Sequence, residues 1–212
     1  MEASFKVVEP YYRQEHFDFF RRYRSPFYAA TFELDATRLK ARTAARGGST
    51  YASLCYCFTR AMRGIEDFRY RFRDGRLVLY AELHMGLTVP APGGRFGFAY
   101  LAWDPDPERF ATHARRVLAE AEGRLSLVEQ PHSNFIFYTA LPRLPVTGLT
   151  HAEIGDPTEG EPRVACGKLV ERGGRRMVPV GIQVNHAFID GAALGELAER
   201  AQAEFDGVGE GG

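Results

Sequence analysis

The sequence predicts an α/β fold, a two-layer sandwich with a mixed, mostly antiparallel sheet and helices on one of its faces. Three observations indicate this. Segments with the two-residue alternation of strands and segments with helical spacing follow one another along the chain. Hydrophobic residues make up 45% of the 212 positions, enough for a sizeable core. We find no boundary that would divide the chain, so we expect one domain over residues 1–212.

Charge and cysteine usage argue against several classes of protein. The 27 acidic and 27 basic residues balance, whereas nucleic-acid-binding proteins usually carry a basic excess. The three cysteines, Cys55, Cys57 and Cys166, do not form a disulfide framework and fit a reduced compartment. No apolar run reaches the length of a signal peptide at the start or of a membrane span elsewhere. We therefore expect a cytoplasmic protein that binds neither nucleic acid nor membranes.

Four elements are predicted in the first quarter of the chain: a helix, a strand and then two helices. Spacing predicts a helix over 10–23, with an apolar stripe of Tyr12, His16, Phe19, Phe20 and Tyr23. A strand follows over 27–34, and Asp35 is expected to cap a helix that ends near the glycines at 47–48. Ser49 is expected to open the next helix, whose apolar positions are Tyr51, Leu54, Cys55, Phe58 and Met62.

A hairpin is predicted next. Aromatic residues alternate with arginines over 68–73, Asp74 and Gly75 form the two-residue turn, and 77–83 is the returning strand. Arginines interleaved with aromatic residues also occur on nucleic-acid-binding surfaces. We expect instead that these arginines lie on the solvent face of an antiparallel sheet.

The middle of the chain continues with alternating elements. Residues 84–103 are predicted to form strand, turn and strand, and their glycines lack the spacing of a phosphate-binding loop. A helix over 105–121 and a strand over 135–140 follow. The proline-rich segment 141–163 is expected to form loops around a short strand, and 163–170 is expected to pair with the last strand.

The segment 177–205 organises the rest of the prediction. Val178, Val180, Ile182 and Val184 alternate as in a strand, and the residues after 190 have the spacing of an amphipathic helix with Asp190 as its cap. His186 lies where the strand gives way to the helix. Rigid turns of this kind are suitable places for catalytic side chains.

This turn carries a resemblance to a known family. The stretch QVNHAFIDG over 183–191 contains His-x3-Asp-Gly and resembles the active-site segment of the chloramphenicol acetyltransferase family, within the wider group of CoA-dependent acyltransferases. The family usually has His where this chain has Asn185. Further similar segments follow in the same order along the chain: YRQEHF over 12–17, FRDGRLV over 72–78, Gly167-Lys168 and 177–184.

The resemblance implies the same fold and a function in acyl transfer. The reaction would move an acetyl group from acetyl-CoA, or another acyl-CoA, to a hydroxyl of a small molecule, chloramphenicol or a changed acceptor. Since the pKa of an imidazole is close to working pH, His186 would be the general base. Arg13 would pair with Asp190 in a structural role, and Gly191 would permit close packing. The family forms homotrimers with active sites between subunits and uses no metal; its members confer antibiotic resistance.

Two departures from the family concern the reaction. A family serine that stabilises the oxyanion aligns with Gly148, so Thr147 is the expected substitute; losing such a donor typically costs about a hundredfold to a thousandfold in rate. The acceptor pocket is expected to include Phe27, Tyr28, Phe135 and Glu159. Glu159 and Gly160 align with an aromatic pair of the family, which favours an acceptor other than chloramphenicol because a buried carboxylate needs a partner.

Three other interpretations stay open. The chain could be the catalytic core of a dihydrolipoyl acyltransferase, although it has no lipoyl segment; a non-catalytic CoA- or ligand-binding homologue; or half of a peptide-synthetase condensation domain, whose chains are about twice as long. No metal site is expected, because His16, His84, His113, His132 and His151 lack ligand spacing. Of these, His84 and His151 fall in segments that align near the cleft.

Overall fold

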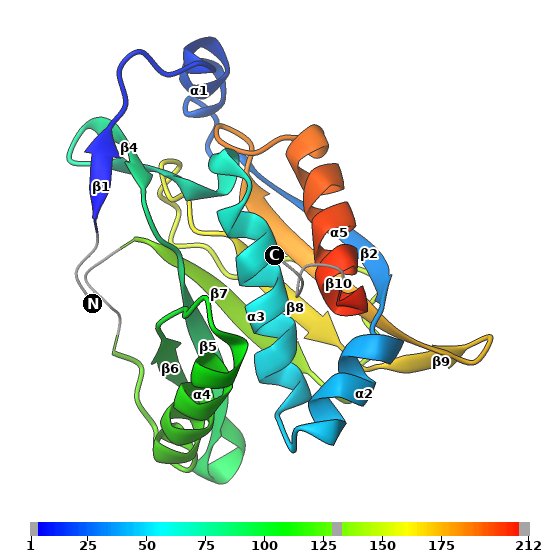
Figure 1. Cartoon of the computed structure of the whole chain (residues 1–212). Helices are drawn as coiled ribbons and strands as arrows, with labels where there is room; N and C mark the ends of the chain where they lie inside the picture. Colours follow the sequence, from blue (N-terminus) through cyan, green and yellow to red (C-terminus); the bar gives the residue numbers. More distant parts are fainter. Residues whose placement is uncertain (1–3, 129–132, 208–212) are drawn as a thin grey trace.

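The computed structural model describes residues 4–128 and 133–207, in which helices and strands alternate (Figure 1). The strands are β1 Phe5–Val7, β2 Phe27–Asp35, β3 Tyr70–Arg73, β4 Arg76–Tyr80, β5 His84–Ala91, β6 Arg95–Leu101, β7 Phe135–Leu141, β8 Arg163–Gly167, β9 Val170–Arg172 and β10 Arg175–Asn185. The helices are α1 Gln14–Phe20, α2 Thr37–Ala45, α3 Thr50–Arg63, α4 Pro107–Ala121 and α5 Gly191–Asp206, with short 3₁₀ turns at Glu66–Arg69 and Pro92–Gly94.

A seven-stranded sheet forms the centre of the molecule. Its order is β2-β10-β8-β7-β5-β6, and β9 also pairs with β10. The pairs β5–β7 and β7–β8 are parallel, whereas β10 is antiparallel to β2, β8 and β9, and β5 is antiparallel to β6. A smaller antiparallel sheet has the order β1-β4-β3. The predicted mixed, mostly antiparallel sheet is confirmed.

Helices α2 to α5 lie on one face of the large sheet, with α3 in the middle (Figure 1). The alternation of β10 explains how they are held: Val178, Val180, Ile182 and Val184 are each at most 1% exposed. They share one core cluster with Leu197 and other apolar residues of α5. Burial of apolar area, at about 25 cal/mol per Å², therefore holds the helix layer to the sheet. The predicted two-layer sandwich is confirmed.

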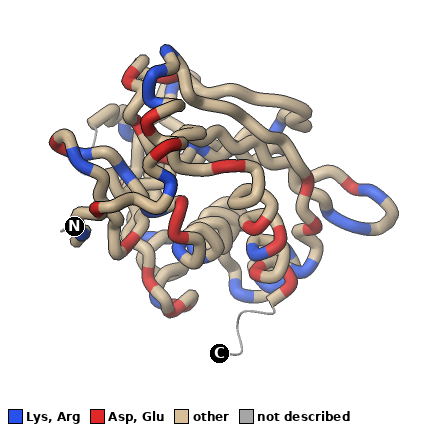
Figure 2. The backbone as a smooth tube through the Cα atoms, turned by 90° about the horizontal axis from the view of Figure 1, so that it is seen from above, with Lys and Arg blue, Asp and Glu red and all other residues tan. Residues whose placement is uncertain are grey.

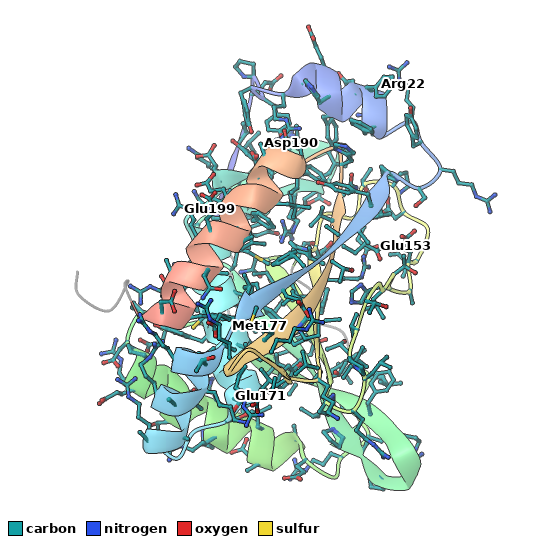
Figure 3. All side chains as sticks on the ribbon, turned by 90° about the vertical axis from the view of Figure 1, so that its right-hand side faces the viewer. Arg22, Glu153, Glu171, Met177, Asp190 and Glu199 are labelled. Atoms are coloured by element: carbon teal, nitrogen blue, oxygen red, sulfur yellow. The ribbon has the colours of Figure 1, made fainter. Side chains whose placement is uncertain are left out.

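The opposite face of the sheet is partly covered by the segment 142–162. Glu153 of this segment and Asp190, which caps α5, lie on opposite sides of the sheet (Figure 3). The segment contains neither helix nor strand, so the short strand expected within 141–163 is wrong. Its prolines lack the N–H groups that a strand needs, and two of its carbonyls, those of Pro157 and Glu159, accept hydrogen bonds from a side chain instead.

The first helix is shorter than predicted and turned to a different face. It covers Gln14–Phe20, not 10–23. Phe17, at 1% exposed, is its buried residue, whereas Tyr12, Phe19 and Tyr23 are about half exposed or more. Tyr12 and Tyr23 lie outside the helix, and Phe17 packs against Phe72 and Phe188, so the inward face depends on contacts that the spacing does not reveal. The expected apolar stripe is therefore wrong.

The hairpin of β3 and β4 turns at Asp74 and Gly75 as predicted, and its returning strand ends at Tyr80 rather than Leu83. One of its arginines contradicts the expected solvent face. Arg71 is 1% exposed and donates to the carbonyls of Phe68, Tyr70, Ser133 and Phe135 at 2.9, 2.7, 2.8 and 3.2 Å. Burial lowers the pKa of this guanidinium. Arg71 thus ties the hairpin to the start of β7.

Three helix starts follow local capping rules. The Ser49 hydroxyl accepts from the N–H of Ala52 at 3.3 Å, and α4 begins at Pro107 behind the cap Asp106. Before α2, Asp35 Oδ1 accepts from the N–H of Thr37 at 2.9 Å, although the residue at the formal cap position is Ala36. The expected functions of Ser49 and Asp35 as caps are therefore confirmed.

Charged residues of both signs are interspersed over the chain (Figure 2). The β9–β10 hairpin projects from the body and carries Arg172, Arg175 and Arg176. Each of these is near a carboxylate, for example Arg172 Nη1 at 2.7 Å from Glu33 Oε2. Within 4–128 and 133–207, no helix has the length and apolar character needed to cross a membrane.

Candidate active site

His186 directly follows β10, at the turn that leads into α5. Its backbone N–H donates to the carbonyl of Pro26 at 2.9 Å, which fixes the turn to the segment before β2. Its ring is stacked on Phe20 of α1, with ring centroids 4.2 Å apart and planes 10° apart. The ring of Tyr28 lies 4.5 Å away on β2. Among the described residues, the buried Nδ1 has no hydrogen-bond partner, so aromatic packing orients this imidazole.

Asp190 and Arg13 hold the same turn. Asp190 Oδ1 accepts from the N–H of Ala193 at 3.0 Å, which caps α5 as predicted. Its Oδ2 is 3.3 Å from Arg13 Nη2, and Arg13 Nη1 donates to the carbonyl of Phe188 at 3.3 Å. The N–H of Ala193, and then the charge of Arg13, lower the pKa of the Asp190 carboxyl. Arg13 therefore links the start of α1 to the turn between His186 and α5.

Gly191 does not have the close neighbours expected for it. A Cβ at this position would meet no described heavy atom within 4 Å. Close packing inside the chain therefore does not explain this glycine.

A cavity of about 640 Å³ opens on the sheet face that turns away from the helices. Alternation along β7 builds one side of it: Phe135, Phe137 and Thr139 line the cavity, while Ile136 points into the core. β5 and β6 add Thr88, Phe96, Phe98 and Tyr100. This wall is largely aromatic and suits the apolar body of a small molecule.

The other side of the cavity is polar. Glu159 forms a close ion pair with Arg163, and both side chains are nearly buried. Burial raises the pKa of Glu159. His151 also lines the cavity, and burial, together with the charge of Arg163, lowers its pKa. Glu159 Oε2, Arg163 Nη1 and both ring nitrogens of His151 have no hydrogen-bond partner among the described residues.

The predicted site residues divide between the cavity and the surroundings of His186. Phe135 and Glu159 line the cavity, and Phe27 lies under the Arg163 guanidinium, 5.9 Å from it. Tyr28 instead packs against His186, and burial raises its pKa to about 12. His186 itself is not among the residues that line the cavity.

Thr147 and Thr139 differ in their access to the cavity. Thr147 is exposed in the 142–162 segment and does not line it, whereas the half-buried Thr139 does. The sequence interpretation missed Thr139 because it looked for a hydroxyl only in the loop after this strand. The two-residue alternation of FIFYTAL over 135–141 is a signal that could have identified Thr139, since positions 135, 137 and 139 share one face of the strand.

Other histidines fit structural positions. His84 is buried, outside the cavity lining, and its Nδ1 accepts from the N–H of Trp103 at 3.2 Å. His132 lies outside the described residues. No group of three His, Cys, Asp or Glu side chains within the described ranges could hold a metal ion.

Comparison with known proteins gives consistent matches over nearly the whole chain. The family model described as chloramphenicol acetyltransferase matches residues 4–202. Chloramphenicol acetyltransferase 2 of Escherichia coli is 25% identical over 199 residues, 92% of this chain and 93% of that protein. A solved chloramphenicol acetyltransferase superposes with a TM-score of 0.85 at 26% identity, covering 95% and 99% of the two chains. A probable dihydrolipoamide acetyltransferase from Listeria monocytogenes shares the fold at 14% identity, with a TM-score of 0.67 over 93% and 91%.

Proposed function

The chain belongs to the chloramphenicol acetyltransferase family, and we propose that it moves an acetyl group from acetyl-CoA to a hydroxyl of a small molecule with His186 as general base. It is an acyltransferase. The observation that supports the assignment of His186 is its setting: an imidazole oriented by Phe20 and Tyr28 at the end of a buried strand. A base held in one orientation suits proton transfer at a fixed acceptor.

The proposed reaction is a direct transfer without an acyl-enzyme. His186 removes the proton of the acceptor hydroxyl as its oxygen attacks the thioester carbonyl. The resulting tetrahedral intermediate collapses by breaking the C–S bond, and the CoA thiolate receives the proton from His186. Asp190 and Arg13 take no part in proton transfer. Their ion pair, at 3.3 Å, and the cap on Ala193 support a role in holding the turn.

The oxyanion of the intermediate needs a hydrogen-bond donor. Thr147 is the donor expected from the resemblance, but it is exposed and outside the cavity lining. Thr139 is the better candidate, because its side chain lies on the β7 face that lines the cavity. We therefore assign the donor to Thr139 and keep Thr147 as the alternative to be tested beside it.

The acceptor is proposed to occupy the 640 Å³ cavity, with its apolar part on the aromatic wall. The Glu159–Arg163 ion pair lies at the polar side of the cavity. It supports an acceptor that carries polar groups, because an apolar ligand would leave these charges without hydrogen-bond partners. Chloramphenicol stays a candidate, and resistance to it would follow only if it is turned over. The three free, buried cysteines fit the proposed cytoplasmic location.

The oligomer is proposed to be a homotrimer with active sites between subunits. The supporting observation is that His186 does not line the cavity of its own chain. A neighbouring copy could bring its cavity to this histidine. The dihydrolipoyl acyltransferase alternative has less support, because the likeness at 14% identity concerns the fold alone.

The test is the release of free thiol from acetyl-CoA, with chloramphenicol and a panel of other small alcohols and amines. Loss of general-base catalysis typically costs about a hundredfold to ten-thousandfold, so His186→Ala should lose turnover while His113→Ala, on the distant α4, keeps it. Thr139→Ala should lower kcat by about a hundredfold and Thr147→Ala by less than about twofold. Equal turnover by His186→Ala and wild type would contradict the proposal, and CoA binding without turnover of any acceptor would favour the non-catalytic homologue.

A further inference from the structure

The segment 142–162 shapes the polar side of the acceptor cavity yet contains no helix or strand. We name this segment the acceptor loop. The loop makes a few hydrogen bonds of its own, such as that from the N–H of Glu159 to the carbonyl of Asp156 at 3.2 Å, and a loop of this length needs partners elsewhere for its other backbone groups. Two amide side chains of β10, Gln183 and Asn185, supply several of them. They lie two residues apart and so point from the same face of the strand, the one that carries the loop.

Gln183 holds the first half of the acceptor loop. It is 2% exposed, and its Oε1 accepts from the N–H of His151 at 2.6 Å. Its Nε2 donates to Glu153 Oε1 at 2.5 Å, and Glu153 Oε2 accepts from the Ser25 hydroxyl at 3.2 Å. This amide therefore fixes one backbone group and one carboxylate of the loop.

Asn185 holds the second half and is 1% exposed. Its Nδ2 donates to the carbonyls of Pro157 and Glu159, both at 2.9 Å. Its Oδ1 accepts from the N–H of Ala187, also at 2.9 Å. One side chain thus bonds the loop that carries Glu159 and the turn that carries His186.

The chemistry of asparagine is needed for this set of bonds. Its amide offers two N–H donors on one nitrogen and a carbonyl acceptor beside them. A neutral imidazole has one donor and one acceptor on different sides of its ring, so histidine at this position could not donate to both carbonyls. Aspartate has the same shape but would present oxygen to two carbonyl oxygens, leaving both unpaired.

We propose that Asn185 is a positioning residue that sets the acceptor loop against the cavity and holds it in register with the His186 turn. The proposal rests on the proposed function for its kinetic consequence, because it takes the cavity as the acceptor site. Its structural consequence, a loop that is released when the two donors are lost, does not depend on any activity.

The kinetic experiment compares Asn185→Asp and Asn185→His with wild type. The acceptor is chloramphenicol or, if wild-type protein does not acetylate it, the alcohol of the panel that it does acetylate. We expect each variant to raise the KM for this acceptor by about tenfold or more, because Asn185→Asp loses both buried hydrogen bonds to the loop and Asn185→His loses at least one, while the KM for acetyl-CoA changes by less than about twofold. The matched control is Gln202→Glu, which makes the same change of amide to carboxylate in a clamp between α5 and Asp35, remote from the cavity. Equal changes in both KM values, or a lower melting temperature with an unchanged acceptor KM, would overturn the proposal.

The second experiment is limited proteolysis with a glutamate-specific protease. The rate of cleavage after the glutamates of the acceptor loop measures how firmly the loop is held. Asn185→Asp should be cut after Glu153 or Glu159 at least about tenfold faster than wild type and Gln202→Glu, since the loop has lost two of its bonds. Unchanged cleavage would overturn the positioning role. If the loop is released in Asn185→Asp but wild-type protein turns over no acceptor, the proposed function fails while the positioning role of Asn185 is supported.

Discussion

At the scale of single residues, Asp190 combines a helix cap with an ion pair. Its Oδ1 caps α5 at Ala193, and its Oδ2 faces Arg13. The two contributions can be separated, because asparagine keeps the cap and loses the charge. Alanine loses both.

We predict that Asp190→Asn lowers the melting temperature at neutral pH and that Asp190→Ala lowers it further, by the equivalent of about 1 kcal/mol for the lost cap. The pKa of Asp190 is lowered in the folded protein, so its charge stabilises the fold above the unfolded-state pKa of about 4. That contribution is lost as pH falls through the lower, folded-state pKa.

The measurement is thermal unfolding of the three proteins between about pH 7 and pH 3. The gap between wild type and Asp190→Asn should shrink toward acid pH, while the gap between Asp190→Asn and Asp190→Ala persists. A wild-type advantage over Asp190→Asn that does not change with pH would show that the carboxylate charge does not stabilise the turn.

The site residues that could be predicted from the sequence are those whose role follows from their immediate neighbours in the chain. Asp190 was identified as a cap because the helix spacing begins directly after it, and His186 because a short motif surrounds it. Arg71 and Thr139 were missed because their roles depend on contacts distant in sequence. The burial of Arg71 depends on carbonyls near Ser133, and the access of Thr139 depends on the cavity formed between β7 and the acceptor loop.

At the scale of elements, the pairing of β5 with β7 limits the size of the cavity. Gly86 of β5 lies opposite Phe137 of β7 in the parallel register. A Cβ on Gly86 would approach the ring of Phe137 to 2.6 Å, so the ring must move. Because both residues line the cavity, any such movement changes its shape.

We predict that Gly86→Ala raises the KM for the acceptor and lowers stability by about 1–3 kcal/mol, as expected for overpacking. Gly195→Ala is the control: a Cβ there meets nothing within 4 Å, and alanine should stabilise the interior of α5 by about 0.5–1 kcal/mol. Steady-state kinetics and denaturant unfolding of both variants measure these effects. An acceptor KM that stays at the wild-type value in Gly86→Ala would place the acceptor outside this cavity.

Strands and long helices were predictable because their periods are regular. The strand of 177–184 and the helix after Asp190 appear as β10 and α5 nearly as predicted. The acceptor loop was less predictable, because its path is set by Gln183 and Asn185 rather than by a pattern of its own. The buried face of α1 was also missed, because it is set by the packing of Phe17 against Phe72 and Phe188, which are distant in sequence.

At the scale of the whole molecule, the two halves of the proposed site do not meet in one chain. The cavity lies on the sheet face away from the helices, while His186 is packed between Phe20 of α1 and Tyr28. In the proposed homotrimer, the cavity of a second copy would receive the acceptor that this His186 deprotonates. Each active site would then draw its base and its cavity from different chains.

Hybrid oligomers test this claim most directly. His186→Ala removes the base, and Thr139→Trp fills the cavity, so oligomers of either variant alone should be inactive. In trimers that contain both chains, about a third of the sites would combine an intact base with an intact cavity from the neighbouring chain. Thiol release by purified hybrid trimers at about a third of the wild-type rate is the predicted result. Hybrids of verified mixed composition that stay as inactive as both parents would contradict a site shared between subunits.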